Sequence, residues 1–356
     1  MTALHTIQVE VVNIGSTSVK TRHFIYDYVG NHIQQQLVDG IIKDCDVDIL
    51  VYRLVHFGNV FYGRPWITLD QVTHDVQENL NKWAPIHNPR VFTHARQRLK
   101  DTRAYSVIFV SDSYFHLSIP MASGTLPLPK RARDAGARVY GFHGFAYMNV
   151  LVQYKTIVDN DRPNLICIHL GGGCSACCIE NGVSIDTTMT ITPNSGLIMP
   201  TRCGNVDISV CDLFDLDTRA LSHDSGLLGI CGTSHLGDIM SGATSDQNED
   251  MILARDMFVQ RIVDAIAVYY VRLNGSVDGI VFSGGISEHV PEIVQLVCCR
   301  LSCIGVTYDG DSDCEFSRGM CFKHTSSSIP IAIVGINEEI EMMKLARSCI
   351  SQMTIT

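Results

Sequence analysis

Four charged or titratable side chains stand where apolar segments of the chain end or turn. Arg53 lies near the end of the apolar run 48–55, and Asp112 closes the run "YSVIFVSD". His143 belongs to "RVYGFHGF", and Arg202 to the small-residue loop "MPTRCGNVD". A charged group in apolar surroundings is costly unless it has a partner or a ligand. Each residue taken alone is more often a structural polar group than a catalyst, but together they indicate a functional set.

A turn rich in small polar residues offers anion chemistry near the start of the chain. The stretch "VVNIGSTSVK" at 11–20 is predicted to be a strand, a turn and the beginning of a second strand. The polar or small residues of this stretch are Asn13, Gly15, Ser16, Thr17, Ser18 and Lys20. Three hydroxyls and a cation suit a backbone cradle for an anion. An ordinary solvated turn is an equal alternative.

Glycine turns occur at two further places that suit a phosphate. "GGGC" at 171–174 joins two apolar strands, and Gly284 with Gly285 follows the strand "GIVFSGG" just before a predicted helix. The amino end of a helix favours a phosphate. Either glycine group alone is equally typical of a plain turn.

The elements that must position these residues alternate between strands and helices. We predict strands near 8–13, 19–28, 48–55 and 105–112, an amphipathic helix over 69–83, and the unit strand, glycine turn, strand and tight turn over 165–187. Further elements are predicted as helices at 250–273 and 288–301, strands at 279–285 and 329–335, and a final helix that opens at Asn337. The strand, glycine turn and strand unit occurs twice, about 155 residues apart, which predicts two domains of one plan in an α/β fold.

Length and composition set outer limits. A chain of 356 residues predicts two domains, and a formal charge of -10 argues against a broad surface for nucleic acid. The longest apolar runs, 262–271 and 329–336, are too short to span a membrane. The first residues do not resemble a secretory signal, so we expect a soluble, cytoplasmic protein.

The 14 cysteines are expected to be buried small hydrophobes rather than disulfides. Those in apolar surroundings are Cys167, Cys177, Cys178, Cys298 and Cys299. A metal site through the C-x-x-C pair Cys174 and Cys177 is a distant alternative, because no second pair at zinc spacing follows it.

Ten stretches in one order over nearly the whole chain resemble the acetate kinase (acetokinase) family. They are "NIGSTSVK", "RLVH", "APIHNP", "VSDSYFHLSIP", "YGFHG", "HLGGGCS", "DTTMTITPNSGLIMPTRCGNVD", "SGLLGICG", "IVFSGGISE" and "INEE". The resemblance implies the duplicated two-domain fold of acetate and sugar kinases, Hsp70 and actin, with a central interdomain cleft. We therefore expect one domain from 1–115 completed by 340–356, and a nucleotide- and phosphate-binding domain over 116–339.

The resemblance also assigns roles to single positions. It implies that Arg53, Asp112, His143 and Arg202 are catalytic, and that Asn13 and Glu338 serve the metal, with Asp112 helping to position it. Residues implied near the transferring phosphoryl group or the acyl substrate are Asn13, Ser16, Ser18, Lys20, Val55, Ile86, Phe142 and Pro193. Residues implied around the nucleotide or its phosphates are His169, Gly171, Gly172, Gly173, His235, Leu236, Gly237, Gly284, Gly285 and Ile286.

The implied activity is reversible in-line transfer of a phosphoryl group from ATP to acetate or propionate, with Mg²⁺ and in a homodimer. Such transfer needs charge stabilisation more than covalent help, which two arginines, a histidine and carboxylates supply. A carboxylate acceptor is already ionised at neutral pH, so no strong base is needed.

Several positions depart from the family pattern. The segment between Lys20 and Arg53 is shorter, Gly172 replaces the asparagine of the phosphate hairpin, and residues 145–147 read Phe-Ala-Tyr instead of Thr-Ser-His. Gly237 stands where an arginine near the nucleotide is usual, and losing a charged hydrogen bond there costs about 1–3 kcal/mol. Pyrophosphate as donor, or a catalytically degenerate binding protein, are therefore alternatives.

Overall fold

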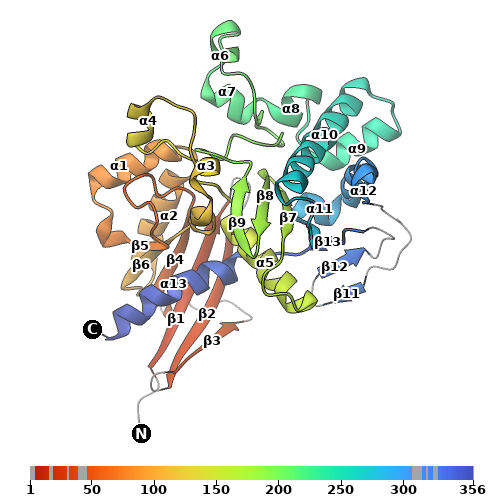
Figure 1. Ribbon diagram of the computed structural model, residues 1–356. Helices are drawn as coiled ribbons and strands as arrows, with labels where there is room; N and C mark the ends of the chain where they lie inside the picture. Colours follow the sequence, from red (N-terminus) through yellow and green to blue (C-terminus); the bar gives the residue numbers. More distant parts are fainter. Residues whose placement is uncertain are drawn as a thin grey trace. The chain divides into compact units, whose positions relative to one another are not determined.

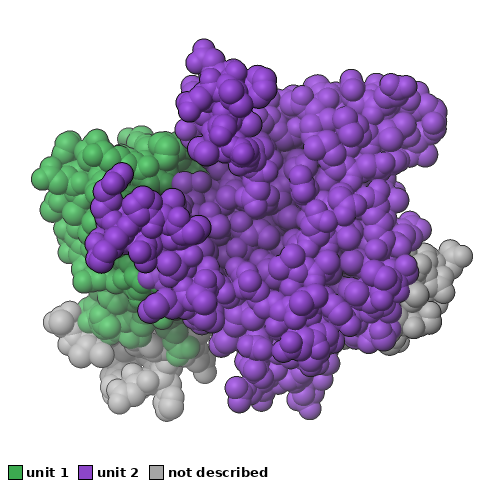
Figure 2. All heavy atoms as spheres, turned by 45° about the horizontal axis from the view of Figure 1, so that its top comes forward, with its two compact units in different colours: residues 1–114, 337–356 green, residues 115–336 purple. Residues whose placement is uncertain are grey.

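The computed structural model describes residues 5–15, 19–29, 32–38, 46–306, 315–317, 320–323 and 328–355. Internal packing divides the chain into unit 1, residues 1–114 with 337–356, and unit 2, residues 115–336 (Figure 2). Phe115, which we expected in the first domain, belongs to unit 2. Residues 337–339, which we expected in the second domain, belong to unit 1, because the last helix begins at Glu338 and packs there. Ser16 and Ser18 lie outside the described residues.

Unit 1 is built on a six-stranded mixed sheet. Its strands are β1 (His5–Ile14), β2 (Val19–Val29), β3 (His32–Val38), β4 (Ile49–Leu54), β5 (Trp66–Thr68) and β6 (Ser106–Ser111), in the order β3-β2-β1-β4-β6-β5. The first three form an antiparallel meander, and β1, β4 and β6 run parallel. The carboxyl ends of β1, β4 and β6 therefore meet at one edge of the sheet.

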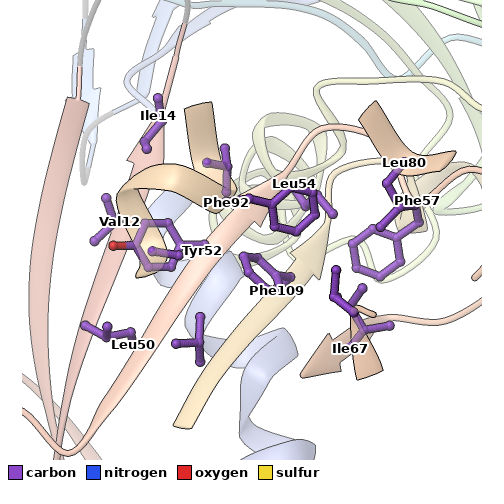
Figure 3. Close-up of a cluster of buried hydrophobic side chains, with 14 of the residues drawn as sticks. Val12, Ile14, Leu50, Tyr52, Leu54, Phe57, Ile67, Leu80, Phe92 and Phe109 are labelled. Carbon is purple, nitrogen blue, oxygen red and sulfur yellow. The ribbon is translucent and has the colours of Figure 1, made fainter. Parts of the chain in front are cut away.

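Helices cover both faces of this sheet. They are the short 3-10 helix at Leu69–Gln71, α1 (His74–Trp83), α2 (Asn88–Asp101) and α13 (Glu338–Ile355). On one face, Phe92 of α2 packs edge-on against Phe109, and both belong to a buried apolar cluster with Val12 and Tyr52 (Figure 3). Since side chains alternate along a strand, residues 9, 11, 13, 51 and 53 point to the opposite face. There α13 packs against β1, β4 and β6 (Figure 1).

Unit 2 carries a seven-stranded mixed sheet. Its strands are β7 (Leu165–Leu170), β8 (Cys174–Glu180), β9 (Val183–Thr187), β10 (Gly279–Ser283), β11 (Glu315–Ser317), β12 (Met320–Lys323) and β13 (Ile331–Val334), in the order β11-β12-β13-β10-β7-β8-β9. The strands β7, β8 and β9 form an antiparallel meander, and β7, β10 and β13 run parallel. In unit 2 the neighbouring strands β9-β8-β7-β10-β13 repeat the order of β3-β2-β1-β4-β6 in unit 1. The predicted duplication of one plan is therefore confirmed.

The helices of unit 2 lie before and between these strands in the sequence. They are two 3-10 helices, Tyr114–Ser118 and Ser302–Ile304, and α3 (Met121–Gly124), α4 (Lys130–Asp134), α5 (Gly144–Val158), α6 (Val210–Leu213), α7 (Thr218–His223), α8 (Gly226–Cys231), α9 (Leu236–Thr244), α10 (Glu249–Arg272), α11 (Gly285–His289) and α12 (Pro291–Cys299). Tyr147, Val150 and Tyr154 of α5 share a buried cluster with Cys167 and Val281 of the sheet. α10 contacts β7 and β8.

Two predicted helices are interrupted. The helix expected over 69–83 is a 3-10 turn followed by α1, because the Thr73 hydroxyl accepts from the Val76 amide and starts a new helix. The helix expected over 288–301 is split into α11 and α12 at Pro291, which cannot continue a preceding helix without losing a hydrogen bond.

The cysteines are buried as predicted at Cys167, Cys177, Cys178 and Cys298. Cys299, predicted to be buried, is exposed, because it ends α12 beside rather than on the buried face formed by Ile293, Val294, Val297 and Cys298. Among the described residues, no helix is both long and apolar enough to cross a lipid bilayer.

Candidate active site

Unit 1 gathers three predicted site residues at the carboxyl edge of its parallel strands. Asn13 lies near the end of β1, Arg53 near the end of β4, and Asp112 directly after β6. The alternation of side chains turns Asn13 and Arg53 to the face that α13 covers. The parallel run of the strands thus brings together residues that are 99 positions apart in the sequence at their extremes.

Arg53 and Asp112 form a buried ion pair at this edge. The Arg53 Nη2 donates to Asp112 Oδ2 over 2.8 Å, and the two side chains are 12% and 0% exposed. Burial by itself would lower the pKa of Arg53, but the charges of Asp112, Glu338 and Glu339 raise it above its ordinary value. Arg53 Nε has no hydrogen-bond partner within the described part of the chain. This guanidinium is therefore a fixed cation with donor capacity left for an anion.

Two glutamates at the start of α13 complete the cluster of unit 1. The Asn13 amide nitrogen donates to Glu338 Oε2 at 2.6 Å and to Glu339 Oε1 at 3.1 Å, while Arg53 Nη1 lies 3.4 Å from Asn13 Oδ1. Asn13 thereby connects the glutamates to Arg53. Glu339 was missed by the sequence reasoning, although it adjoins Glu338 in "INEE".

The donor chemistry of this cluster fits magnesium. Mg²⁺ is commonly held by only one or two carboxylates, with water and substrate phosphates filling its other positions. Glu338 is the less buried of the two glutamates, and Asp112 lies at the same sheet edge. Among the described residues no group of three or more His, Cys, Asp or Glu side chains could hold a metal ion by itself.

Unit 2 gathers His143, His169 and Arg202 around Gly173. The imidazole rings of His143 and His169 are 4.5 Å apart between centroids. A Cβ on Gly173 would lie 3.0 Å from His143 Nε2 and 3.1 Å from Arg202 Nη1. The two nitrogen atoms therefore approach one small space, which stays open because residue 173 is glycine. Arg202 is held there by donating through Nη1 to the Pro193 carbonyl over 3.0 Å.

His143 is fixed by its backbone as well as by its side chain. It precedes α5 in the left-handed conformation, with φ 59°, which is unusual for a residue other than glycine. His116, buried in the same unit, makes a hydrogen bond through Nε2 with the Phe142 carbonyl over 3.0 Å. Gly141 has no Cβ where His116 packs, and a Cβ there would collide with the ring. His116 was not singled out from the sequence, since a buried histidine in a short helix leaves no distinct pattern.

The glycine turns take different roles. Gly171 donates its amide to the Gly173 carbonyl over 3.0 Å and so closes the turn between β7 and β8, while Gly172 is exposed. Gly284 has φ 88°, and a Cβ there would lie against the Leu170 carbonyl. Only glycine therefore allows β10 to end beside the end of β7.

The remaining predicted residues are placed within their own units but not gathered into these clusters by any contact described above. In unit 1, Lys20 and Ile86 are exposed and Val55 is buried. In unit 2, Phe142 and Leu236 are buried, and His235 is an exposed residue that pairs with Asp238 over 3.2 Å. Gly237 lies in the first turn of α9, and Gly285 and Ile286 open α11.

The alternative metal pair Cys174 and Cys177 is disfavoured by geometry. Both residues belong to β8, and side chains three positions apart on a strand point to opposite faces. The Cys174 thiol donates to the Gly171 carbonyl, whereas the Cys177 sulfur lies 3.4 Å from Ser184 Oγ. The two sulfurs therefore do not face one ion.

Two sheets of one strand order, each with polar side chains at the ends of its parallel strands, define the duplicated fold of acetate and sugar kinases, Hsp70 and actin. A model of the acetokinase family matches residues 16–344. Acetate kinases from Campylobacter concisus and Mycoplasma capricolum are 32% and 33% identical over 310 and 303 residues, which cover 83% and 81% of this chain and 77% and 75% of those proteins. The chain therefore belongs to the acetokinase family, which makes it a kinase.

Solved structures agree with this fold. The acetate kinase of Porphyromonas gingivalis superposes with a TM-score of 0.76 at 25% identity, covering 95% of this chain and 98% of that one. The acetate kinase of Entamoeba histolytica gives a TM-score of 0.78 at 24% identity, covering 96% of this chain and 99% of that one. A propionate kinase from Francisella tularensis gives 0.77 at 24% identity, with coverages of 95% and 98%.

Proposed function

We propose that this protein transfers a phosphoryl group from ATP to acetate or propionate, reversibly and by direct in-line displacement. The observation that carries the proposal is the buried pair of Arg53 and Asp112 at the ends of β4 and β6, in a chain of the acetokinase family. A guanidinium fixed by a carboxylate, with an unused Nε donor, suits the oxygens of a phosphoryl group.

The chemistry assigns distinct work to each cluster. In the transfer, negative charge spreads over the equatorial oxygens of the moving group, and fixed cations and donors lower its energy. In this proposal the groups that supply this charge and these donors are Arg53 in unit 1, and Arg202 with His143 in unit 2. The acceptor carboxylate is ionised at neutral pH and attacks without a general base.

Glu338 and Asp112 are the residues that would hold or position magnesium. When bound, the ion would neutralise charge on the phosphates of the donor. Asn13, through its contacts with both Glu338 and Arg53, would keep the metal-binding carboxylate and the cation in register.

We assign the carboxylate acceptor and the phosphoryl donor to different sets of residues. Val55, Ile86, Phe142 and Pro193 would supply apolar contact for a short acyl chain, where one methylene is worth about 1–3 kcal/mol. His169, the 171–173 turn, residues 235–237 and residues 284–286 would contact ATP. Because Gly237 has no side-chain donor, we expect a weaker contact with ATP at this position.

A donor comparison tests the proposal. The full chain is incubated with acetate, Mg²⁺ and either ATP or pyrophosphate, and acyl phosphate is trapped with hydroxylamine. We expect hydroxamate with ATP, far less with Arg202→Ala, and a wild-type yield with Arg162→Ala, an exposed arginine of unit 2.

Other outcomes of that assay are equally informative. If acyl phosphate forms with pyrophosphate but not with ATP, pyrophosphate is the phosphoryl donor. No product with acetate, propionate or butyrate and either donor would defeat the proposal, and a raised melting temperature under those conditions would favour a binding protein without activity.

A further inference from the structure

Two buried hydroxyls stand behind His143 on the side away from Gly173. Ser175 of β8 places its Oγ 2.9 Å from His143 Nδ1, and the same Oγ is hydrogen-bonded to the Tyr147 hydroxyl. Ser175 and Tyr147 are completely buried, and His143 is 8% exposed. The three side chains form a short chain from Tyr147 through Ser175 to the imidazole.

Local structure explains why these residues meet. Tyr147 follows His143 by four positions and donates its amide to the His143 carbonyl over 3.1 Å, so both side chains lie on one side of the first turn of α5. Ser175 stands opposite His169 in the β7–β8 register, and the strand alternation turns both toward α5. Tyr147 is therefore held by a helix and Ser175 by a strand, which are both rigid supports.

The number of hydroxyl protons determines which side chain donates in each of these two hydrogen bonds. Within the described residues, neither Tyr147 Oη nor Ser175 Oγ has a hydrogen-bond partner beyond these two contacts. If His143 carried its proton on Nδ1, Ser175 would accept it and donate to Tyr147, which would leave the buried Tyr147 proton without an acceptor. If Tyr147 donates to Ser175, and Ser175 donates to His143 Nδ1, every hydroxyl proton is used. Burial raises the pKa of Tyr147 well above its ordinary value, which keeps it a donor.

We propose that Tyr147 and Ser175 are positioning residues that set the tautomer of His143, so that Nδ1 accepts from Ser175 and Nε2 carries the proton. This inference rests on the proposed function, in which His143 donates to the moving phosphoryl group. Nε2 is the nitrogen that approaches the open space at Gly173, next to Arg202 Nη1. A ring with its proton on Nδ1 would instead present a lone pair to an anion at that place.

The tautomer of His143 matters because of the side chains that lie next to its ring. Its ring faces His169, whose centroid is 4.5 Å away, and the Arg202 guanidinium near Gly173. A ring with its proton on Nε2 offers a hydrogen-bond donor next to the Arg202 guanidinium, so both groups present donors to the same small space.

The test measures the tautomer directly. Wild type, Ser175→Ala and Tyr147→Phe are labelled with ¹⁵N-histidine, and the ring nitrogens of His143 are observed by NMR above the pH range of imidazole protonation. Loss of signals in His143→Asn assigns them. We expect a protonated Nε2 and an unprotonated Nδ1 in wild type, and ring-nitrogen shifts that converge toward a tautomer mixture in both variants.

The control is Tyr154→Phe, which removes a buried hydroxyl from the same helix, where Tyr154 Oη donates to the Asp278 carbonyl. It should leave the His143 shifts as in wild type. A wild-type Nδ1 that carries the proton would overturn the inference. Unchanged His143 shifts in Ser175→Ala and Tyr147→Phe would also overturn it.

A kinetic measurement separates this inference from the proposed function. If ATP-dependent acyl phosphate formation occurs, kcat should fall about tenfold or more in Ser175→Ala with KM for both substrates unchanged, because the donor acts in the transition state. A fall equal to that of Tyr154→Phe would contradict a positioning role. If wild type forms no acyl phosphate, the proposed function fails, while the NMR result still decides the tautomer.

Discussion

At the scale of single residues, buried charge explains most of the candidate site. Arg53 was predictable because a cation at the end of an apolar strand needs a partner, and that partner is Asp112. Asp112 was predictable by its place at the end of a strand. Ser175 was not, because a buried serine inside the strand "CSACCIE" gives no sign that it faces a histidine. The contact arises only when α5 and β8 pack.

Removing the carboxylate of the Arg53 pair should destabilise unit 1. In Asp112→Asn the buried guanidinium loses its nearest counter-charge, and breaking such a pair costs about 3–5 kcal/mol. Both tryptophans of the chain, Trp66 and Trp83, belong to unit 1, so their fluorescence during urea unfolding reports this unit. Asp101→Asn, an exposed change in the same unit, is the matched control. Equal unfolding midpoints for the two variants would show that the pair adds no stability.

A second buried pair should make the stability of unit 1 depend on pH. Burial alone would raise the pKa of Glu10, but hydrogen bonds and charge from Arg98 and His23 lower it from 4.5 to about 2. Because the folded pKa lies below the unfolded one, this stability is fully present above pH 4.5 and is lost as pH falls toward 2. Glu10→Gln should therefore be less stable than wild type at pH 7, and the difference should narrow near pH 3.

The same tryptophan fluorescence measures this difference in urea at each pH. Glu78→Gln, an exposed glutamate of unit 1, serves as the control and should track wild type. A stability gap for Glu10→Gln that stayed constant between pH 7 and pH 3 would rule out the linkage.

At the scale of elements, the turn between β7 and β8 positions the donors of unit 2. The methyl group in Gly173→Ala would lie 3.0 Å from His143 Nε2 and 3.1 Å from Arg202 Nη1, which is too close for a carbon atom. Both side chains must therefore shift. We expect kcat for acyl phosphate formation to fall at least about tenfold, because misplacing a catalytic group by a fraction of an ångström is costly. Gly124→Ala, whose Cβ would meet only ordinary contacts from 3.5 Å, should retain activity. Wild-type kcat in Gly173→Ala would remove this turn from the active site.

Most of the predicted elements have a strong period, but α2 was overlooked although its buried residues Asn88, Val91, Phe92 and Ala95 follow a helical period. The apolar residues of β1, the continuous apolar runs of β4 and β6, and the repeated hairpin predicted these strands correctly. The helix α5 was missed because it is buried around most of its circumference, so "GFAYMNVLVQYKTIV" has no clear polar stripe. The helices α6 to α8 have four to six residues each, too short to show a period. The N-cap residue Thr73 and Pro291 are helix-start signals in the sequence, and the prediction overlooked both.

At the scale of the whole molecule, binding of the donor should stabilise the fold. A ligand at 100 times its Kd adds about 2.7 kcal/mol, so Mg²⁺ with ATP should raise Tm by several degrees. Glu338→Gln should lose the part of this shift that requires Mg²⁺ and keep the part that ATP gives alone. An equal Mg²⁺-dependent shift in Glu338→Gln and wild type would exclude Glu338 as a metal residue. The homodimer implied by the family stays a prediction, which sedimentation of the full chain would test.

Because the fold is duplicated, each of the two units carries its own set of charged and polar side chains. Each unit places polar residues at the ends of parallel strands, and the order of strands in the two sheets is the same. Unit 1 contributes Arg53 with its carboxylates, and unit 2 contributes His143 and Arg202. The proposed phosphoryl transfer requires both sets.

A double-mutant cycle on kcat/KM for acetyl phosphate formation from Mg²⁺, ATP and acetate tests that claim most directly. It compares wild type, Arg53→Ala, Arg202→Ala and the double variant, each checked for a folded state by its melting transition. Since residues that act as a unit in one chemical step give non-additive losses, we expect each single variant to lose at least about 100-fold and the double variant to lose far less than the product of the two. Wild-type kcat/KM in either single variant, or fully multiplicative losses in the double variant, would contradict the account.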